Sequence, residues 1–339
     1  MPHPPHRTRT RLLAAGLAAA ALTTTGYGAA QGQELTSDPG GTTVLLLGRD
    51  TRAGLSAAEQ RRLHAGGQGC DCSDVIMLMH LSGNGRRAGV LSIPRDVYAP
   101  RLGRKINAAH SIGGRRLAER TVEDLTGVDI DTVLTVKFAG FEKIVDDLGG
   151  AQVCTRRPLR DLQYTGLNLP AGTHRLDGQQ AIAYARSRHN TTNGDITRIR
   201  RQQRLTSDLA GRIIDTGDLH DRRRLEKLAA QLAKSLHTTP GNSTKDLLEL
   251  GWKARNLKLE NVEFATPPIA DLGATVPGAG STVALHRQHA QRMFHTMQND
   301  KPLHTAETRR GTNALEQDTR TTAGTRFGCE GSPTQPTTP

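Results

Sequence analysis

The chain has 339 residues, which is enough for one large or two ordinary domains with an apolar core. Its formal net charge of +12 indicates an anionic partner, whether nucleic acid, anionic lipid or a phosphorylated substrate. Aromatic residues make up only 3% of the chain, and no zinc-finger, RNP-like or basic-zipper pattern occurs, so we expect no nucleic-acid partner.

The N-terminal segment has the pattern of an export signal. Three arginines lie between residues 7 and 11, and residues 12–22 are an uninterrupted run of Leu, Ala and Gly. The run is shorter than the roughly 20 residues that span a bilayer, and the small residues Gly28 and Ala30 fit a cleavage site. We expect a signal peptide or N-terminal membrane anchor over residues 1–30 and a linker over 31–41, with the body of the chain outside the cytoplasmic membrane.

Apolar periodicity and turn residues predict strands that alternate with helices along the body of the chain. The expected strands lie at residues 42–47, 75–81, 88–93, 132–138, 151–154, 262–266 and 282–285. The expected helices are a short one after Ser56 and longer ones at 115–125, 141–148, 177–186, 196–214, 225–236, 245–256 and 288–297. This alternation is typical of a layered α/β domain.

The C-terminal segment and the cysteines depart from this pattern. Residues 300–339 are rich in Thr, Arg, Gly and Pro without apolar periodicity, so they are expected to be a disordered tail. The cysteines Cys70, Cys72, Cys154 and Cys329 lack the spacing of a zinc site, and in an exported chain they favour disulfides. Three pairings are possible; Cys154 with Cys329 is favoured, because Cys70 and Cys72 are too close for an easy bridge to each other.

The stretch at 169–203 combines an amphipathic apolar run with many guanidinium groups. If Asp195 begins a helix, then Asp195, Arg198 and Gln202 share one face of it. The arginines at the ends of the two predicted helices are Arg186, Arg188, Arg198 and Arg201. Planar guanidinium groups suit phosphate oxygens, which accept paired hydrogen bonds. The alternative, that these arginines only solvate helix surfaces, is less favoured because apolar residues interleave them.

Two aspartates follow or begin predicted strands beside loops, where the active-site groups of α/β sheets gather. Asp50 and Asp74 could together hold Mg²⁺, which prefers oxygen ligands and keeps several waters beside substrate phosphates. Isolated aspartates in such places are usually turn or cap residues. The cations available to the same site favour a functional reading: they are Arg95, Lys105, Arg186, Arg188, Arg198 and Arg201. This set fits a site that neutralises a pyrophosphate with a metal ion and arginines together.

Several motifs occur together and in order. They are LLLGRDTR at 45–52, CSDVIMLMHL at 72–81, LSIPRDV at 91–97, KINAAHSIGG at 105–114, FEKIVDDLGG at 141–150, and LDGQQAIAYARSRH with GDITRIRRQQ at 176–203. Through them the chain resembles the LytR-CpsA-Psr family of cell-envelope proteins, over a motif-bearing core at 42–206. Residues up to about 299 resemble the less distinctive C-terminal part of actinobacterial members.

The resemblance implies a three-layer α/β/α fold with a central mixed β-sheet and a catalytic domain over 42–299. It implies a Mg²⁺-dependent phosphotransferase that moves an anionic glycopolymer from a polyprenyl-pyrophosphate carrier onto peptidoglycan. The expected product is a phosphodiester at the C6 hydroxyl of N-acetylmuramic acid. By motif position, Asp50 and Asp74 would hold the metal. The residues expected to bind the pyrophosphate are Arg95, Lys105, Arg186, Arg188, Arg198, Arg201 and Gln202.

The residues expected to take part in the reaction itself are Arg95, Asp96, Asp195 and Arg198. Asp96 or Asp195 could orient or deprotonate the attacking hydroxyl, although pairing with arginine is favoured for both. Apolar residues of 133–148 are candidates for the wall of a lipid cleft. Cys72 stands where the family has Arg before Ser-Asp, so one phosphate contact is expected to be missing or supplied by another side chain such as Arg52.

Three other functions stay open. A lipid pyrophosphatase would use the same site with water as the acceptor. A non-catalytic carrier would only hold polyprenyl phosphate lipids. A regulator of the transcriptional-attenuator type would act on DNA through the positive charge of the chain. DNA binding conflicts with the export signal and with the lack of a recognition-helix motif.

Overall fold

The structure is a computed structural model that describes residues 40–51, 55–65, 70–188, 194–238, 243–306, 321–324, 327 and 329–330. The predicted signal peptide or anchor, most of the linker and Arg52 lie outside the described residues. Among the helices that the structure does describe, none is long and apolar enough to cross a bilayer.

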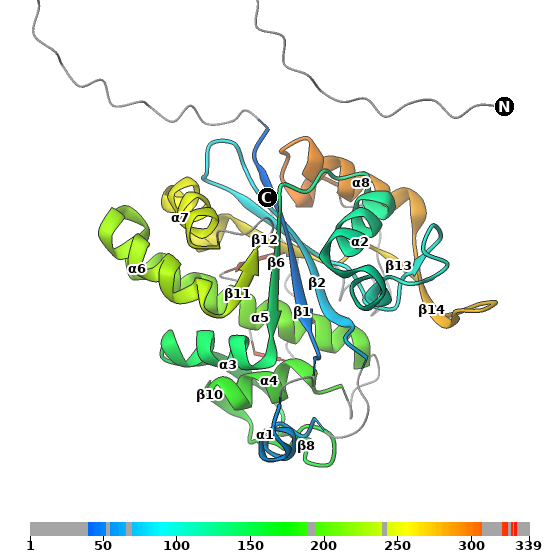
Figure 1. The fold of residues 1–339 in the computed structure, drawn as a ribbon, viewed down its shortest axis with the longest axis horizontal. Helices are drawn as coiled ribbons and strands as arrows, with labels where there is room; N and C mark the ends of the chain where they lie inside the picture. The colour runs from blue at the N-terminus through cyan, green and yellow to red at the C-terminus, as the bar shows by residue number, and fades with distance from the viewer. Residues whose placement is uncertain are drawn as a thin grey trace, which may run out of the picture. The chain divides into compact units, whose positions relative to one another are not determined.

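A seven-stranded mixed β-sheet lies at the centre of the fold (Figure 1). In spatial order its strands are β11 (Leu236–Thr238), β6 (Thr132–Lys137), β1 (Thr42–Arg49), β2 (Ser73–Leu81), β3 (Ala88–Ser92), β12 (Val262–Ala265) and β15 (Thr322–Ala323). β1 is parallel to β6 and antiparallel to β2, and β3 is parallel to β12. The central strands are long apolar runs because helices cover both of their faces.

Alternate residues of β1 show which helices cover each face of the sheet. Leu45 is buried in one cluster with Val122 of α2 (Ala109–Thr126) and Phe294 of α8 (Arg287–Gln298). Val44 points to the opposite face and packs with residues of α6 (Arg222–Ala233) and of α7 (Ser243–Lys253), among them Leu247. Figure 1 shows these helix pairs on either side of the strands. The structure therefore confirms the predicted α/β/α layers and the mixed sheet.

Four further helices and pairs of short strands complete the fold. The helices are α1 (Ala57–Arg62), α3 (Phe138–Asp147), α4 (Gly178–Arg186) and α5 (Gly194–Asp215). The paired strands are β4 (Tyr98–Ala99) with β5 (Arg104–Lys105), β7 (Ala151–Thr155) with β10 (Gly172–Leu176), β8 (Leu159–Asp161) with β9 (Leu167–Leu169), and β13 (Ile269–Val276) with β14 (Gly280–Leu285). Short 3₁₀ turns lie at Ile106–Ala108, Asp218–His220, Ala254–Asn256, Leu259–Asn261 and Leu303–Ala306.

The predicted boundaries are close at most elements and wrong at a few. The capping box of α1 is present, because Ser56 accepts from the backbone of Glu59 and the Glu59 carboxylate accepts from the Ser56 N–H. The segment of α2 begins six residues earlier than predicted (109 against 115), with a break at Gly113 and Gly114, where the backbone is not helical. Phe138, predicted to end a strand, begins α3 instead.

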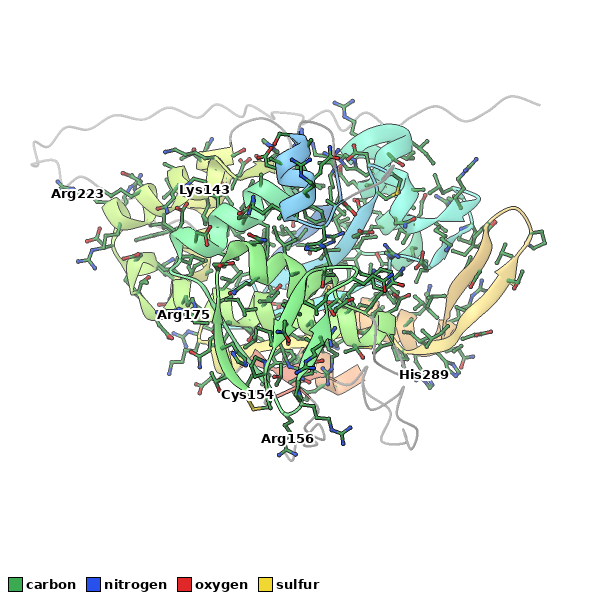
Figure 2. All side chains as sticks on the ribbon, turned by 90° about the horizontal axis from the view of Figure 1, so that it is seen from below. Lys143, Cys154, Arg156, Arg175, Arg223 and His289 are labelled. Atoms are coloured by element: carbon green, nitrogen blue, oxygen red, sulfur yellow. A yellow bond between two sulfur atoms is a disulfide. The ribbon has the colours of Figure 1, made fainter. Side chains whose placement is uncertain are left out.

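The described residues of the C-terminal segment pack against the domain, so for them the prediction of a disordered tail at 300–339 is wrong. Leu303 is buried, β15 pairs with β12, and Cys329 forms a disulfide with Cys154. Figure 2 shows Cys154 with its disulfide bond, close to Arg156. Cross-linking and edge pairing hold a segment that lacks apolar periodicity of its own. The favoured pairing of Cys154 with Cys329 is confirmed.

The other disulfide corrects an expectation. Cys70 and Cys72 are bonded to each other, with their Cα atoms 5.0 Å apart. We expected these residues to be too close in sequence for an easy bridge. A single intervening residue in a loop still allows a separation within the usual range of about 4.4–6.8 Å.

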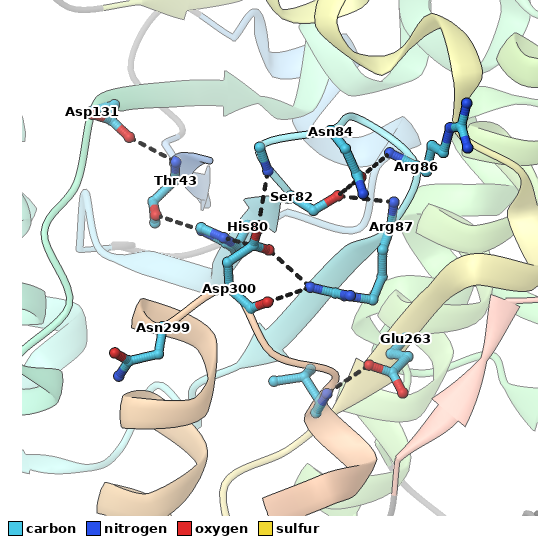
Figure 3. Close-up of polar contacts among 12 residues, drawn as sticks. Thr43, His80, Ser82, Asn84, Arg86, Arg87, Asp131, Glu263, Asn299 and Asp300 are labelled. Atoms are coloured by element: carbon cyan, nitrogen blue, oxygen red, sulfur yellow. Dashed lines mark hydrogen bonds and ion pairs between the residues drawn. The ribbon is translucent and has the colours of Figure 1, made fainter. Parts of the chain in front are cut away.

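A polar network joins the start of β1 and the end of β2 to the residues after α8 (Figure 3). The N–H of Thr43 donates to Oδ2 of Asp131 at 2.7 Å, and the Thr43 hydroxyl lies 3.0 Å from Nδ1 of His80. Asp300 accepts from Arg87 at 2.8 Å and lies 3.4 Å from Nε2 of His80. Burial lowers the pKa of His80, and the nearby carboxylates only partly offset this effect. The network ties β1 and β2 to the segments that precede β3 and β6 and to the residues after α8, around a histidine that is neutral at physiological pH.

Candidate functional site

A cavity of about 430 Å³ lies where β1 ends and β2 begins. The end of β6 and the helices α3, α4 and α5 form the rest of its wall. The predicted site residues that line it are Asp50, Asp74, Arg95, Arg186, Arg188, Arg198 and Gln202. Residues that lie far apart in the sequence therefore meet in one place.

The same cavity has an apolar wall. The apolar side chains that line it include Leu46, Met77, Val136, Phe138, Phe141, Ile182 and Leu205. Three of them fall within the predicted lipid-cleft segment, 133–148, whereas Val133 and Val145 of that segment are buried in the core. The cavity thus combines cationic and apolar surfaces, which is what a ligand with a phosphate head and an apolar chain requires.

Arg95 follows β3 and contacts two carboxylates, those of Asp74 and Asp96. Its NH1 lies 2.6 Å from Oδ1 of Asp74, and its Nε lies 3.4 Å from Oδ2 of Asp96. Lys105 pairs with the other oxygen of Asp96 at 3.0 Å. Asp96 and Lys105 are not among the residues that line the cavity; they lie behind Arg95. Burial acts to lower the pKa of Arg95, but the neighbouring carboxylates, Asp74 above all, outweigh it and raise that pKa.

Arg198 lies near the start of α5 and is buried, with 6% of its surface exposed. Its NH2 lies 3.3 Å from Oδ1 of Asp195, which is not a lining residue. Among the described residues, no group forms a hydrogen bond with its buried Nε. Burial first, and then the charges of Arg95 and Arg188, lower the pKa of Arg198. Crowded like charges with an unsatisfied donor favour the binding of an anion.

The end of α4 contributes Arg186 and Arg188. NH1 of Arg186 donates to the carbonyl of Leu63 at 2.7 Å, and its guanidinium lies 5.2 Å from the ring centre of Phe138. From α5, Nε2 of Gln202 donates to the carbonyl of Ala185 at 3.3 Å. Helix α4 begins with a capping box, in which the side chains of Asp177 and Gln180 each accept a hydrogen bond from the backbone N–H of the other residue. The arginines at its C-terminal end therefore extend from a well-defined helix.

Arg201 lies elsewhere, although its sequence position suggested a phosphate ligand. It is fully buried, does not line the cavity, and pairs with Glu330 at 2.5 Å. Its NH1 donates to the carbonyl of Ser187 at 2.5 Å. Its donors are therefore engaged inside the protein.

Some lining residues were not predicted. Arg49 lines the cavity and pairs with Asp71, and the exposed Tyr164 lies on its wall. The position of Arg49 directly before Asp50 in LLLGRDTR was a usable signal. Tyr164 lies in the turn between two three-residue strands, and nothing in the sequence pattern marks it.

Asp50 and Asp74 are the carboxylates of the cavity wall that could hold a divalent cation. Asp50 and Asp74 both line the cavity, and Asp74 is shared with Arg95. No group of three or more metal-ligating side chains occurs in the described part of the chain. Mg²⁺ beside a phosphate substrate needs only one or two carboxylates, because phosphate and water supply the other oxygens.

Cys72 contributes to the same corner through its backbone. Its carbonyl accepts from the N–H of Asp50 at 3.3 Å, and its side chain is bonded to Cys70. A cysteine thus anchors the loop at the position where the family resemblance led us to expect an arginine.

This fold and this cavity define an α/β/α protein with a site lined by arginines, carboxylates and apolar side chains. The sequence profile of the LytR_cpsA_psr family matches residues 18–299, and the chain belongs to this family.

Similar proteins agree with this assignment. The cell wall biosynthesis protein LcpA of Corynebacterium glutamicum is 29% identical over 289 residues, which cover 75% of this chain and 55% of LcpA. The probable cell wall biosynthesis protein LcpB of the same organism is 38% identical over 183 residues, 53% of this chain and 44% of LcpB. The chain spans about half the length of these relatives. The structure of Bacillus subtilis TagT bound to LI-WTA superposes with a TM-score of 0.57 at 28% identity, covering 78% of this chain and 92% of TagT.

Proposed function

We propose that this protein transfers an anionic glycopolymer from a polyprenyl-pyrophosphate carrier to peptidoglycan, on the outer side of the cytoplasmic membrane. The observation that carries the proposal is the cavity itself, which places Arg95, Arg188 and Arg198 beside an apolar wall. Membership of the family, the names of LcpA and LcpB, and the likeness to TagT bound to LI-WTA support a role in the cell wall.

In the proposed reaction, a hydroxyl of the acceptor, the C6 hydroxyl of N-acetylmuramic acid, attacks the phosphorus next to the glycopolymer. A bond forms between that oxygen and the phosphorus, and the bond to the bridging oxygen breaks. Polyprenyl monophosphate leaves with the bridging oxygen, and the hydroxyl proton passes to solvent. The product is a phosphodiester between the glycopolymer and peptidoglycan.

The arginines hold the pyrophosphate and stabilise the charge that grows on the leaving phosphate. Arg198 has a buried donor without a partner among the described residues, and Arg95 lies close enough to lower its pKa. Asp195 pairs with Arg198 and would orient it. Asp96 pairs with both Arg95 and Lys105 and would orient these two cations. Neither carboxylate is assigned as a base.

Asp50 and Asp74 would hold Mg²⁺ in this site. When bound, the ion would neutralise phosphate oxygens and act as a Lewis acid. Arg95 contacts Asp74 directly, so its guanidinium would bind both the Asp74 carboxylate and a phosphate of the substrate.

The test uses purified protein, a polyprenyl-pyrophosphate-linked glycan and peptidoglycan, with mass spectrometry of the products. The expected result is a phosphodiester-linked glycan on peptidoglycan and free polyprenyl monophosphate. Arg95→Ala should abolish it, whereas Arg101→Ala, at an exposed arginine paired with Asp124, should not. Release of a phosphorylated glycan in solution, with none on peptidoglycan, would identify a pyrophosphatase instead. Retained lipid without turnover would identify a carrier.

A further inference from the structure

Glu330 is fixed on the edge of β7 near the end of the described chain. Its N–H donates to the carbonyl of Cys154 at 2.7 Å, and its carbonyl accepts from Arg156 at 3.0 Å. The preceding residue, Cys329, is bonded to Cys154. Figure 2 shows Cys154 and Arg156 together at this edge. Two hydrogen bonds and a cross-link therefore set the backbone position of Glu330.

The Glu330 carboxylate points inward to two fully buried side chains. It accepts from Nε of Arg201 at 3.0 Å and from NH2 of Arg201 at 2.5 Å. It also accepts from the hydroxyl of Tyr184 at 3.0 Å. Burial, and then the Glu330 charge, raise the pKa of Tyr184, so the phenol stays protonated and donates. The carboxylate thus compensates a buried charge and is oriented by a neutral donor.

The third guanidinium nitrogen of Arg201, NH1, connects this pair to the wall of the cavity. Its NH1 donates to the carbonyl of Ser187 at 2.5 Å. Ser187 is fully buried and is the only residue between Arg186 and Arg188, both of which line the cavity. Arg201 also lies within one turn of Arg198 on α5. A continuous chain of contacts runs from the C-terminal segment to the phosphate-binding arginines.

We infer that Glu330 is a positioning residue for the pyrophosphate site and that it acts through Arg201. Without the carboxylate, the buried guanidinium loses its counter-charge and must reorient or draw in water. The Ser187 carbonyl then loses its donor, and the backbone that presents Arg186 and Arg188 is no longer held. The inference rests on the proposed function, because it names what sets the geometry of that same site.

Two variants separate positioning from simple destabilisation. Glu330→Gln removes the charge and keeps the size of the side chain. Arg201→Lys keeps a buried cation that can pair with Glu330, but it lacks the planar guanidinium that also donates to the carbonyl of Ser187. The matched control is Asp208→Asn on α5. Like Glu330, Asp208 pairs with an arginine of that helix, since its Oδ2 lies 2.8 Å from Nε of Arg212. The same oxygen accepts a hydrogen bond from a backbone N–H of β7 at 2.8 Å.

The probe is geranyl pyrophosphate, with its Kd measured by titration calorimetry and its KM and kcat measured from the release of geranyl monophosphate with peptidoglycan as the acceptor. We expect both variants to raise Kd and KM by roughly 10- to 100-fold, because the loss of one charge-assisted hydrogen bond to a phosphate oxygen weakens binding by about that factor. Loss of folded molecules alone would lower kcat and leave KM unchanged. Asp208→Asn should lower the thermal midpoint without changing Kd.

The outcomes distinguish this inference from the proposed function. Wild-type Kd and KM in Glu330→Gln and Arg201→Lys would overturn the positioning role, even if the wild type is active. If the wild type binds the probe but neither cleaves nor transfers it, the proposed reaction fails, and the ratio of Kd values decides the inference. A wild type that does not bind the probe would overturn both.

Discussion

Replacing Arg198 with methionine should remove activity while leaving the protein as stable as before, or more stable. Methionine fills the space of the aliphatic stem and removes the charge. In the protein without ligand, burial, Arg95 and Arg188 lower the pKa of Arg198, so its charge is less favourable in the folded than in the unfolded state. Asp195 would lose its ion pair, but 34% of its side chain is exposed and water can replace the contact.

The two effects have different sizes. Charge-assisted hydrogen bonds contribute about 1.5–3 kcal/mol each, so losing a paired set costs about 3–6 kcal/mol in the transition state. This corresponds to a loss of about 10²- to 10⁴-fold in kcat/KM. Replacing a poorly compensated buried charge with an apolar side chain is neutral or stabilising, here by about 1 kcal/mol, which raises Tm by about 2–4 °C.

The assay combines transfer to peptidoglycan with thermal unfolding followed by circular dichroism. Arg212→Met is the control, since Arg212 lies on the same helix and pairs with Asp208 away from the cavity. Destabilisation of Arg198→Met by more than about 2 kcal/mol would show that the guanidinium has a structural partner and would refute the reasoning. Transfer at the wild-type rate would refute the role of Arg198 in the site.

Three further predictions concern stability. The pKa of His80 in the folded protein lies below its unfolded value of about 6.5, so the contribution of His80 to the free energy of unfolding is complete above about pH 6.5 and is lost as the pH falls toward the folded pKa. In urea unfolding, the free energy should therefore fall by at most about 1.4 kcal/mol per pH unit in this range, and His80→Gln should make this pH dependence weaker. Cys329→Ser opens a cross-link between positions 175 residues apart and should cost about 2–5 kcal/mol, read as a lower urea midpoint; an unchanged midpoint would refute this. Gly85 has φ +67°, and an added Cβ would lie 2.1 Å from the carbonyl of Lys253, so Gly85→Ala should cost at least about 1–3 kcal/mol in the same assay.

The sequence predicted the parts of the fold that carry strong local signals. The strands β1, β2, β3 and β6 are long apolar runs, and a turn of Gly-Asn-Gly marks the hairpin between β2 and β3. Strands of two or three residues, such as β8 and β9, were missed because so short a segment shows no periodicity. The C-terminal segment was misjudged for a related reason, since its order comes from Cys154 and from β12, both distant in sequence.

The candidate site shows the same division. The family motifs, together with the number of nearby cations, sufficed to name Asp50, Asp74, Arg95 and Arg198 as members of one site, although isolated aspartates in such places are usually turn or cap residues. Their convergence required the strand order of the sheet, which brings the end of β1, the start of β2 and the helix α5 together.

The sequence by itself determined the layered α/β class, the family motifs and the positive charge, because these depend on composition and on patterns within a few residues. Only the tertiary structure decided which arginine faces the cavity. Arg201 and Gln202 are neighbours on α5, yet Gln202 lines the cavity while Arg201 is buried against Glu330. Each residue of an α-helix is rotated by about 100° from the one before, so adjacent side chains meet different surroundings. A carboxylate 129 residues away, which no local pattern could reveal, sets the role of Arg201.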